Sequence, residues 1–402
     1  MIWQFLHIID IALWLLMAAS VVYILFFALV STLWKKRVSR LTTYLTGRVL
    51  AMRKKDFYSY LILYPAYNED RVIVNSVQKF LAQYYPYSCF HVAVISDHMQ
   101  PETNQKLSEL PITLLQPVFE KSSKAKAMQY AMDQIKDDYD FIVILDADNV
   151  VGSHFLEQLN TECAKGYKAI QCHRCAKNND NDIAVLDGVS EEINNTIFRK
   201  AHNRIGLSSA LIGSGMCFDF QWFKENVYKL TTAGEDRELE ALLLQQEVYI
   251  HYEPDIHVFD EKVSNKDNFQ KQRLRWMTAQ IQSLFRLLPY IPKAITTFNL
   301  DYIDKTIQQA LIPRSMLVVG ALGMSLLMTA FSLLFSLSWY IKWWCLFLAV
   351  CIALYIATPK QLRKHSVFGK ILALPKLVWK MAMNILKIDR KNTDFIHTSH
   401  NK

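Results

Sequence analysis

Two aspartates separated by one residue follow a strongly apolar run of the chain. The run is DFIVIL, residues 140–145, and the pair is Asp146 and Asp148. Carboxylate oxygens are the ligands that Mg²⁺ and Mn²⁺ prefer, and water and diphosphate oxygens can complete the coordination of either ion. The pair therefore indicates a divalent-cation site. A loop with two turn-forming aspartates is the structural alternative, because a D-x-D match arises by chance roughly once in a chain of this length.

A second acidic pair, Glu235 and Asp236, begins the segment AGEDRELEALLLQQ, in which leucines follow at helical spacing. Acids in the first turn stabilise a helix by about 0.3 to 1 kcal/mol, so a purely structural role would explain the pair. The functional alternative makes Asp236 a general base that removes the proton of an acceptor hydroxyl.

The motif QRLRW places three functional groups on one face of a predicted helix. Gln272, Arg275 and Trp276 are separated by three and four residues, and such positions are neighbours on a helix surface. A planar guanidinium can bind diphosphate oxygens, and an indole offers a flat apolar face to a sugar ring. The surrounding segment 267–289 has an apolar stripe, which is typical of a helix lying along a membrane surface. On such a helix the arginine and the tryptophan can also act simply as interfacial anchors.

Short apolar runs alternate with helical patterns in the first part of the chain. The predicted strands are 58–65, 90–96, 112–116 and 140–145, and the predicted helices between them are 69–84 and 124–135. This alternation predicts an α/β fold with a mostly parallel sheet covered by helices on both faces. Ligands bind beyond the carboxyl ends of the strands in such sheets. Three strands end in PAYNED, SDH and DADN, so these polar side chains are expected to share one edge of the sheet.

Three runs without a charged residue predict membrane-spanning helices: 11–34, 315–341 and 343–359. A helix needs roughly 20 apolar residues to cross the hydrocarbon core, so the third run is marginal. Basic residues follow the first run and flank the other two. The positive-inside rule then places the N-terminus and a loop at Lys342 outside, and residues 35–314 and the C-terminal tail in the cytoplasm. We therefore expect a multi-pass protein of the cell membrane.

These features divide the chain into five predicted parts. They are a transmembrane anchor at 1–40, a cytoplasmic α/β domain at 41–266, interfacial helices at 267–314, two transmembrane helices at 315–358, and a cytoplasmic tail at 359–402 with a further amphipathic helix at 370–386. The net charge of +8 is spread along the chain, which suits anionic lipid head groups and a phosphorylated substrate rather than nucleic acid. The seven cysteines are expected to be reduced, and the lone C-x-x-C of Cys172 and Cys175 is interpreted as packing rather than a metal site.

In chain order, PAYNE, SD, DAD, GSG, GED and QRLRW together resemble the motifs of the membrane-integrated glycosyltransferases of family 2, the group that includes cellulose, chitin and hyaluronan synthases. The resemblance covers most of residues 58–315. It implies a GT-A fold for the domain at 41–266, a UDP-sugar donor, and inversion at the anomeric carbon to form a β-linkage. SDH stands where many relatives have two acids, GED replaces the commoner TED, and three spans are fewer than in the large polymer synthases.

The resemblance also implies roles for individual residues. Asp236 would be the catalytic base, and Asp146 and Asp148 would hold Mg²⁺ or Mn²⁺ together with the donor diphosphate. The other implied binding residues are Pro65, Ala66, Tyr67, Glu69 and Asp97 around the uridine, Lys126 or its neighbour Lys124 near the nucleotide, Gly213 and Gly215 beside the acceptor sugar, and Gln272, Arg275 and Trp276 over the diphosphate and the acceptor.

Three functions remain open at this point. The first is a polysaccharide synthase, which QRLRW favours because the motif is usual in processive relatives. The second adds a single sugar to a lipid-linked acceptor, which the small number of spans favours. The third is an inactive nucleotide-binding membrane subunit, which is disfavoured because the acidic and Q-x-x-R-W positions are intact. A soluble dinucleotide-binding enzyme is disfavoured too, because no G-x-G-x-x-G follows the first predicted strand.

Overall fold

The first half of the α/β domain alternates strands with helices. The structure is a computed structural model that describes residues 2–34, 55–178, 182–232, 234–262, 266–331 and 337–363. The elements in this half are β1 (Tyr60–Tyr67), α3 (Ile73–Leu81), η2 (Tyr87–Cys89), β2 (Phe90–Asp97), α4 (Pro101–Ser108), β3 (Thr113–Leu115), α5 (Lys124–Gln134) and β4 (Phe141–Ile144). Every strand and helix predicted between residues 58 and 145 is therefore confirmed, and α4 is an additional helix.

The second half of the domain is less regular. Its elements are β5 (Val150–Val151), α6 (Phe155–Cys163), β6 (Ala169–Ala176), α7 (Asp182–Asn194), the π-helical η3 (Asn195–Ala201), α8 (His202–Arg204), β7 (Met216–Asp219), α9 (Phe220–Asn226), η4 (Val227–Lys229), α10 (Glu235–Gln245) and β8 (Ile250–Asp260). The helix predicted from Glu235 onward is confirmed as α10.

All eight strands form one mixed sheet in the order β3-β2-β1-β4-β7-β6-β8-β5. Strands β3, β2, β1 and β4 are parallel, β7 is antiparallel to both of its neighbours, and β8 is parallel to β6. The carboxyl ends of β1, β2, β4, β6 and β8 therefore lie at the same edge of the sheet. Strand β7 starts at this edge, with Met216 opposite Ile144, so the GSG segment before it arrives beside the end of β4.

Helices cover both faces of the sheet because the side chains of its central strands alternate between two apolar cores. In β1, Tyr60 and Ile62 face one core, whereas Leu61 and Leu63 face the other. Helices α3 and α6 contribute to the first core, and α5, α9 and α10 contribute to the second. Strands that are buried on both faces read as continuous apolar runs, which is why the pattern of the sequence located them well.

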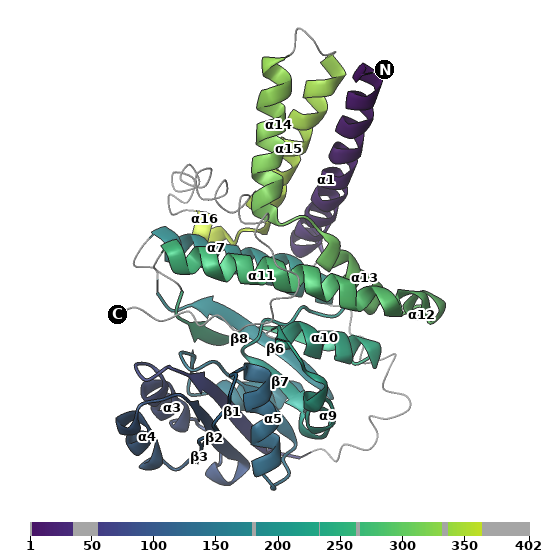
Figure 1. Cartoon of the computed structure of the whole chain (residues 1–402). Helices are drawn as coiled ribbons and strands as arrows, with labels where there is room; N and C mark the ends of the chain where they lie inside the picture. Colours follow the sequence, from purple (N-terminus) through teal and green to yellow (C-terminus); the bar gives the residue numbers. More distant parts are fainter. Residues whose placement is uncertain are drawn as a thin grey trace.

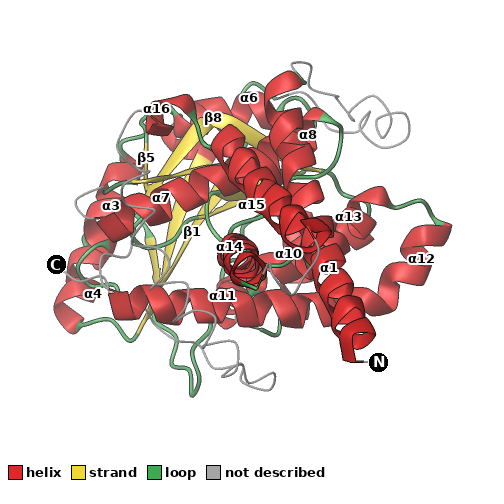
Figure 2. Cartoon of the chain, turned by 90° about the horizontal axis from the view of Figure 1, so that it is seen from above, coloured by secondary structure: helices red, strands yellow, loops and turns green. Residues whose placement is uncertain are grey.

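A layer of helices separates the sheet from a helical bundle (Figure 1). The layer contains α11 (Lys266–Leu287), η5 (Leu288–Tyr290), α12 (Ile291–Thr296) and α13 (Leu300–Ala310), and the bundle contains α1 (Ile2–Leu33), α14 (Arg314–Ala330) and α15 (Leu337–Ala357), followed by α16 (Lys360–Arg363). Seen along the bundle, α14 stands over the space between α7 and α11 (Figure 2). The bundle therefore rises from the edge of the sheet at which the polar strand ends gather.

Helices α1 and α15 are long and apolar enough to cross a membrane, and α13 with α14 would form a third crossing if this pair, bent by 50°, counts as one span. Outward-facing apolar side chains such as Val22, Leu348 and Ile352 are exposed. Exposed apolar side chains of this density are costly in water and are expected of a helix that contacts lipid.

The prediction of a loop at Lys342 is wrong. Helix α14 ends at Ala330 and α15 begins at Leu337, so Lys342 lies inside α15. The lysine forms an ion pair with Asp10 of α1, whose carboxylate also accepts a hydrogen bond of 2.8 Å from Nε1 of Trp343. A lysine whose charge is compensated by an aspartate in this way can be accommodated within an apolar helix. The amphipathic helix predicted at 370–386 lies outside the described residues.

Candidate active site

A cavity of about 920 Å³ lies between the carboxyl-end edge of the sheet, helices α7, α10 and α11, and the base of the bundle. Most of the predicted site residues line it: Pro65, Ala66, Tyr67, Glu69, Asp97, Asp146, Asp148, Gly213, Asp236, Gln272, Arg275 and Trp276. Two predicted residues, Lys126 and Gly215, do not. The fold thus brings residues that are more than two hundred positions apart in the sequence into one cavity.

The turn after β1 and the turn after β2 form one wall of the cavity. Tyr67 pairs with Asp97 in the parallel register, and the next residue in each strand, Asn68 and His98, has a positive φ that turns the chain sharply. Asp97 is buried, and its carboxylate lies 2.5 Å from Nδ1 of His98. The third residue of SDH, His98, therefore orients the buried acid.

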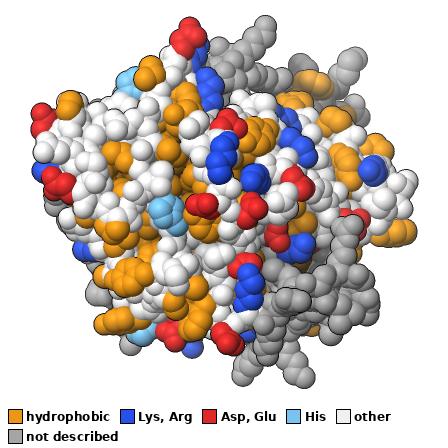
Figure 3. All heavy atoms as spheres, turned by 90° about the horizontal axis from the view of Figure 1, so that it is seen from below, with side chains coloured by type: hydrophobic (Ala, Val, Ile, Leu, Met, Phe, Trp, Pro, Cys, Tyr) orange, Lys and Arg blue, Asp and Glu red, His pale blue; other side chains and the backbone are white. Residues whose placement is uncertain are grey.

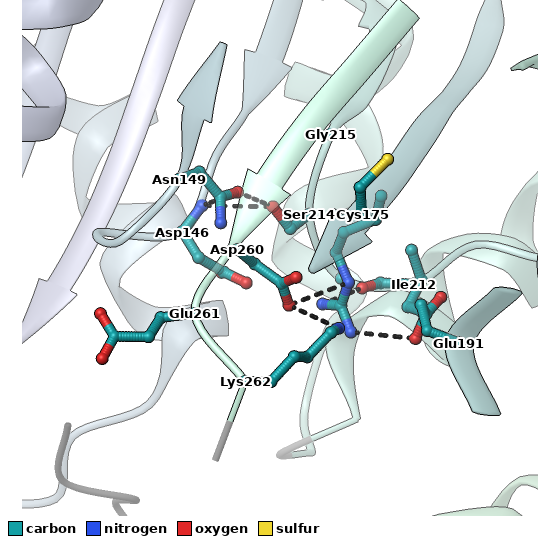
Figure 4. Close-up of polar contacts among 12 residues, drawn as sticks. Asp146, Asn149, Cys175, Glu191, Ile212, Ser214, Gly215, Asp260, Glu261 and Lys262 are labelled. Atoms are coloured by element: carbon teal, nitrogen blue, oxygen red, sulfur yellow. Dashed lines mark hydrogen bonds and ion pairs between the residues drawn. The ribbon is translucent and has the colours of Figure 1, made fainter. Parts of the chain in front are cut away.

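The DAD turn is held by its own hydrogen bonds. The amide oxygen of Asn149 accepts the backbone N–H of Asp146 at 2.9 Å, and its Nδ2 donates to Asp148 at 3.0 Å. The other carboxylate oxygen of Asp148 accepts the N–H of Glu261, which follows β8, at 2.7 Å. Figure 4 shows Asp146, Asp260 and Glu261 around the strand ends. These bonds fix both aspartates at the wall of the cavity.

Lys124 is the basic residue in direct contact with the DAD turn. Its Nζ lies 2.5 Å from a carboxylate oxygen of Asp146, 2.6 Å from the carbonyl of Gly213 and 3.6 Å from Glu235. Burial lowers the pKa of Lys124, but the carboxylates of Asp146 and Glu235 together raise it by more than burial lowers it. The pKa of Lys124 is therefore raised overall, and the group stays protonated. Lys126 lies about half a helical turn away, is exposed, and donates to the carbonyl of Lys121. The nucleotide-binding role predicted for Lys126 therefore falls to Lys124.

The donor set at this edge fits a hard divalent cation. Burial, followed by the negative charges of Asp148 and Asp146, raises the pKa of Glu69 to about 8. Burial also raises the pKa of Glu235 to about 7, against the lowering effect of Lys124 and with a further increase from Asp236. A divalent cation at Asp146 and Asp148 would offset this crowding of negative charge, and each carboxylate oxygen keeps a lone pair for coordination besides the hydrogen bond that it accepts.

The raised pKa of Glu69 predicts how the stability of the metal-free chain depends on pH. The folded chain keeps this proton up to about pH 8, whereas an unperturbed glutamate releases it near pH 4.5. The folded state then holds more protons than the unfolded state, so the free energy of unfolding falls as pH rises through that window. Thermal unfolding in chelator should show a smaller fall in Glu69→Gln, whereas exposed Glu225→Gln should behave as wild type. An unchanged slope in Glu69→Gln would contradict the assignment.

Asp236 is the second residue of α10 and faces the cavity. One of its carboxylate oxygens accepts the N–H of Arg237 at 2.8 Å. The other lies beside Gly213, because a Cβ added to this glycine would stand 3.7 Å from it. Glu235, one residue earlier, instead points to Lys124. Of the two acids of GED, Asp236 thus has an oxygen available to an acceptor in the cavity.

The two glycines of GSG have different roles. Gly213 has a φ of +75°, lines the cavity and gives its carbonyl to Lys124. Gly215 has a φ of +63° and immediately precedes β7; its N–H donates to the carbonyl of Ile144, and a Cβ would come within 3.0 Å of Val258. Gly215 therefore serves the close packing of the GSG segment against Val258 of β8, and the predicted contact with an acceptor sugar remains only for Gly213.

Replacing Gly213 by alanine should impair transfer more than it impairs folding. A left-handed φ costs a residue with a Cβ about 1 to 2 kcal/mol, and the new methyl group would also stand beside the free oxygen of Asp236. Gly152→Ala is the matched control, since no atom lies within 4 Å of its added Cβ. We expect a modest drop in thermal stability with a larger loss of turnover for Gly213→Ala only. Wild-type turnover in Gly213→Ala would place the acceptor elsewhere.

Helix α11 forms the roof of the cavity. Gln280 donates 3.1 Å and 2.8 Å hydrogen bonds to the carbonyls of Gln309 and Leu311, which fastens the helix to the bend between α13 and α14. Arg273 forms a 2.7 Å ion pair with Asp187 of α7, and its guanidinium lies 4.7 Å from the ring of Trp276. The Oε1 atom of Gln272 is buried and has no hydrogen-bond partner among the described residues. That orphaned acceptor is suited to a hydroxyl of a bound molecule.

The far wall of the cavity carries a charged network that the sequence motifs do not reveal. Arg174 of β6 lies 3.4 Å from both Glu191 and Asp260, and Lys262 lies 3.0 Å from Asp260 (Figure 4). Arg199 contacts the same Glu191 at 3.0 Å. The available signal was the charged Arg174 of CHRC, which lies inside strand β6.

Two further groups of metal-ligand side chains are present among the described residues, and neither lines the cavity. They are His173, Cys175 and His257, and the buried set Glu162, His251 and Glu253. Cys172 packs in the core, as predicted, whereas Cys175 belongs to the first of these groups.

The family profile described as "Glycosyltransferase like family 2" matches residues 59–279. No curated protein matches the chain. Among solved structures, the chain is similar to the mannosyltransferase PcManGT from Pyrobaculum calidifontis in complex with GDP-Man and Mn²⁺, with 15% identity, a TM-score of 0.47, and coverage of 85% of this chain and 99% of that chain. It is also similar to S. aureus TarS 1–349, with 13% identity, a TM-score of 0.42, and coverage of 81% and 91%.

The matched region runs from the start of β1 to the Q-x-x-R-W helix, and it makes up more than half of the chain. It therefore includes the sheet, the DAD turn, α10 and the roof of the cavity. The chain belongs to the glycosyltransferase like family 2 and is an α/β, GT-A-type glycosyltransferase that uses a nucleotide sugar.

Proposed function

We propose that the chain is a membrane-bound, inverting glycosyltransferase that moves a hexose from a UDP-sugar to an acceptor hydroxyl and forms a β-linkage. The observation that carries the proposal is the convergence of Asp146, Asp148, Asp236 and Arg275 on one cavity. These residues come from the end of β4, the start of α10 and the middle of α11, so only the fold brings them together.

The donor occupies the strand-end side of the cavity. Pro65, Ala66, Tyr67, Glu69 and Asp97 contact the nucleoside. Asp146 and Asp148 would hold Mg²⁺ or Mn²⁺, and such an ion, when bound, stabilises negative charge on a departing diphosphate. Lys124 at the strand-end wall and Arg275 in the roof add two positive charges to the same cavity, and fixed charges of this kind favour a transition state in which negative charge develops.

The acceptor reacts in a single in-line displacement. The free oxygen of Asp236 removes the proton of the acceptor hydroxyl while the hydroxyl oxygen attacks the anomeric carbon. The bond from that carbon to the diphosphate breaks on the opposite side, so the configuration inverts. Gln272, with its orphaned amide oxygen, and Trp276 hold the acceptor against α11.

The bundle anchors the chain in the cell membrane with the catalytic domain in the cytoplasm. Two helices have the length and composition to cross, and, apart from Lys342, the basic residues that flank them in the sequence follow their C-terminal ends, on the side of the domain. The face of the domain opposite to the bundle carries interspersed acidic and basic side chains, as expected of a surface in contact with water (Figure 3).

Two acceptors are considered. A growing polysaccharide is supported by the Q-x-x-R-W motif, which is usual in processive relatives. A lipid-linked acceptor is supported by the cavity itself, because its second half runs along apolar side chains of α14 and α15.

A screen of nucleotide sugars against membranes that contain the protein tests the proposal. UDP release should require one particular UDP-sugar, should increase with Mg²⁺ or Mn²⁺, and should disappear with a chelator. A labelled product that forms a ladder indicates polymerisation, whereas a single species indicates one addition. Membranes that release no nucleotide diphosphate above an empty-membrane background with any donor would refute the assigned reaction.

A further inference from the structure

The cavity continues past the catalytic residues into the helical bundle. Beyond Gln272 and Arg314 it is lined by apolar side chains of α14 and α15, namely Val318, Val319, Leu322, Phe347, Cys351 and Leu354. Tyr355 also lines it and is 49% exposed, so the cavity opens sideways on the surface of the bundle. This half of the cavity resembles a groove that faces the bilayer, and a hydrated sugar chain would find few hydrogen-bonding partners there.

The interior of the bundle is filled by packed side chains. Leu317 and Ala321 of α14 and Trp343, Val350 and Ala353 of α15 are fully buried in one apolar cluster, to which α1 contributes as well. The ion pair between Asp10 and Lys342 lies farther along the same bundle. The three described helices thus enclose a solid core, and the groove runs along their side.

A basic site marks the junction between the two halves of the cavity. Arg314, the first residue of α14, donates from Nη2 to the carbonyl and the hydroxyl of Ser190, both at 3.2 Å. Its Nη1 atom is buried and has no hydrogen-bond partner among the described residues. Arg273 lines the same cavity, where Asp187 neutralises it. A buried guanidinium N–H without an acceptor is costly, and a phosphate oxygen is the acceptor that suits it best.

We propose that the acceptor is a membrane lipid whose apolar chain lies in the groove of α14 and α15, whose phosphate binds Arg314, and whose head group carries the hydroxyl that reacts. This inference rests on the proposed function and adds the chemical class of the acceptor. One cavity offers a contact for each part of such a molecule, since the carboxylate of Asp236, the amide of Gln272, the guanidinium of Arg314 and the apolar groove all line it.

The reaction with this acceptor balances without a further reagent. The O–H bond of the head group breaks and its proton passes to the carboxylate of Asp236. The oxygen forms a bond to the anomeric carbon, and the bond between that carbon and the diphosphate breaks, so the nucleoside diphosphate leaves with the electron pair. The product is a glycosylated lipid that stays in the membrane.

The experiment incubates membranes containing the full chain with the labelled donor identified by the screen, and then partitions the product between chloroform–methanol and water. The label should enter the organic phase, in a product that also contains lipid phosphorus. Arg314→Gln should lower this label by roughly tenfold or more, whereas Arg314→Lys should retain more of it. Val318→Trp, which narrows the groove, should lower it as well.

Two matched controls separate these effects from general changes in charge or packing. Lys360→Gln removes an exposed charge of α16, and Leu326→Trp enlarges an exposed side chain of α14 that does not line the cavity. Both should keep wild-type levels of organic-phase label. Arg314→Gln and Val318→Trp should still bind UDP and should still release it slowly from the donor in detergent without added lipid, which shows that the chain is folded and the donor site intact.

Transfer of label to a water-soluble ladder, or an Arg314→Gln variant that glycosylates lipid at the wild-type rate, would overturn the lipid acceptor and leave the proposed transferase function in place. A wild-type chain that transfers label to neither phase and releases no UDP would refute the transferase function, and the acceptor assignment with it.

Discussion

Replacement of Asp236 by asparagine should lower the rate of sugar transfer by about 10²- to 10⁴-fold, the usual contribution of a positioned general base. The amide has nearly the same shape as the carboxylate, and its oxygen can still accept the N–H of Arg237 that holds the side chain at the start of α10. It has no basic oxygen to receive the acceptor proton. The loss should therefore appear in kcat, measured by UDP release from the full chain at saturating donor.

A second acid of the same helix provides the control. Glu238 lies two residues further along α10, is bound to Arg286 and to the backbone of Thr231, and does not line the catalytic cavity. Glu238→Gln should transfer sugar at nearly the wild-type rate. Nucleotide affinity and thermal unfolding should be similar in both variants. If Asp236→Asn turned over normally, a different group would have to accept the proton.

The pattern of the sequence located the parallel half of the sheet because β1, β2 and β4 are buried on both faces and are therefore continuously apolar. The same reasoning explains why DAD, SDH and PAYNED were recognised together, since parallel strands deliver their carboxyl ends to one edge. Strands β5, β6, β7 and β8 were not predicted. Polar and charged residues such as Arg174 and Asp255 interrupt the apolar pattern of β6 and β8. Strands β7 and β5 are short, with four and two residues, and their pairing partners are far away in the sequence.

The charged side of the site was less predictable because it depends on tertiary contacts. Arg314 was read as a flank of a membrane span, and only its position over Ser190 of α7 reveals an unsatisfied guanidinium in the cavity. Likewise, Lys124 and Lys126 are equivalent in the sequence, and the direction of α5 against the sheet decides which of them reaches Asp146. The ion pair of Lys342 with Asp10 joins residues more than three hundred positions apart, so an uncompensated lysine wrongly suggested a loop.

Replacement of Asp146 by asparagine should abolish the effect of divalent cations on nucleotide binding. Loss of a residue that merely orients a metal ligand typically costs about 10- to 100-fold in affinity, so loss of a ligand itself should cost about 100-fold or more. Asp146 is the better choice for this test, because the Asp148 carboxylate also holds Asn149 and the N–H of Glu261 and its removal would disturb the turn. Asp133→Asn, an exposed substitution on α5, is the control.

Calorimetric titration of UDP with Mn²⁺, and again with a chelator, measures this effect, and the electron paramagnetic resonance signal of free Mn²⁺ reports cation binding directly. Wild type and Asp133→Asn should bind UDP more tightly with Mn²⁺, whereas Asp146→Asn should bind it weakly under both conditions. The variant also removes the closest acidic partner of Lys124, whose less neutralised positive charge should favour the diphosphate. Lost affinity in spite of that added attraction would therefore trace to the cation. Metal-dependent binding retained in Asp146→Asn would instead place the cation away from the DAD turn.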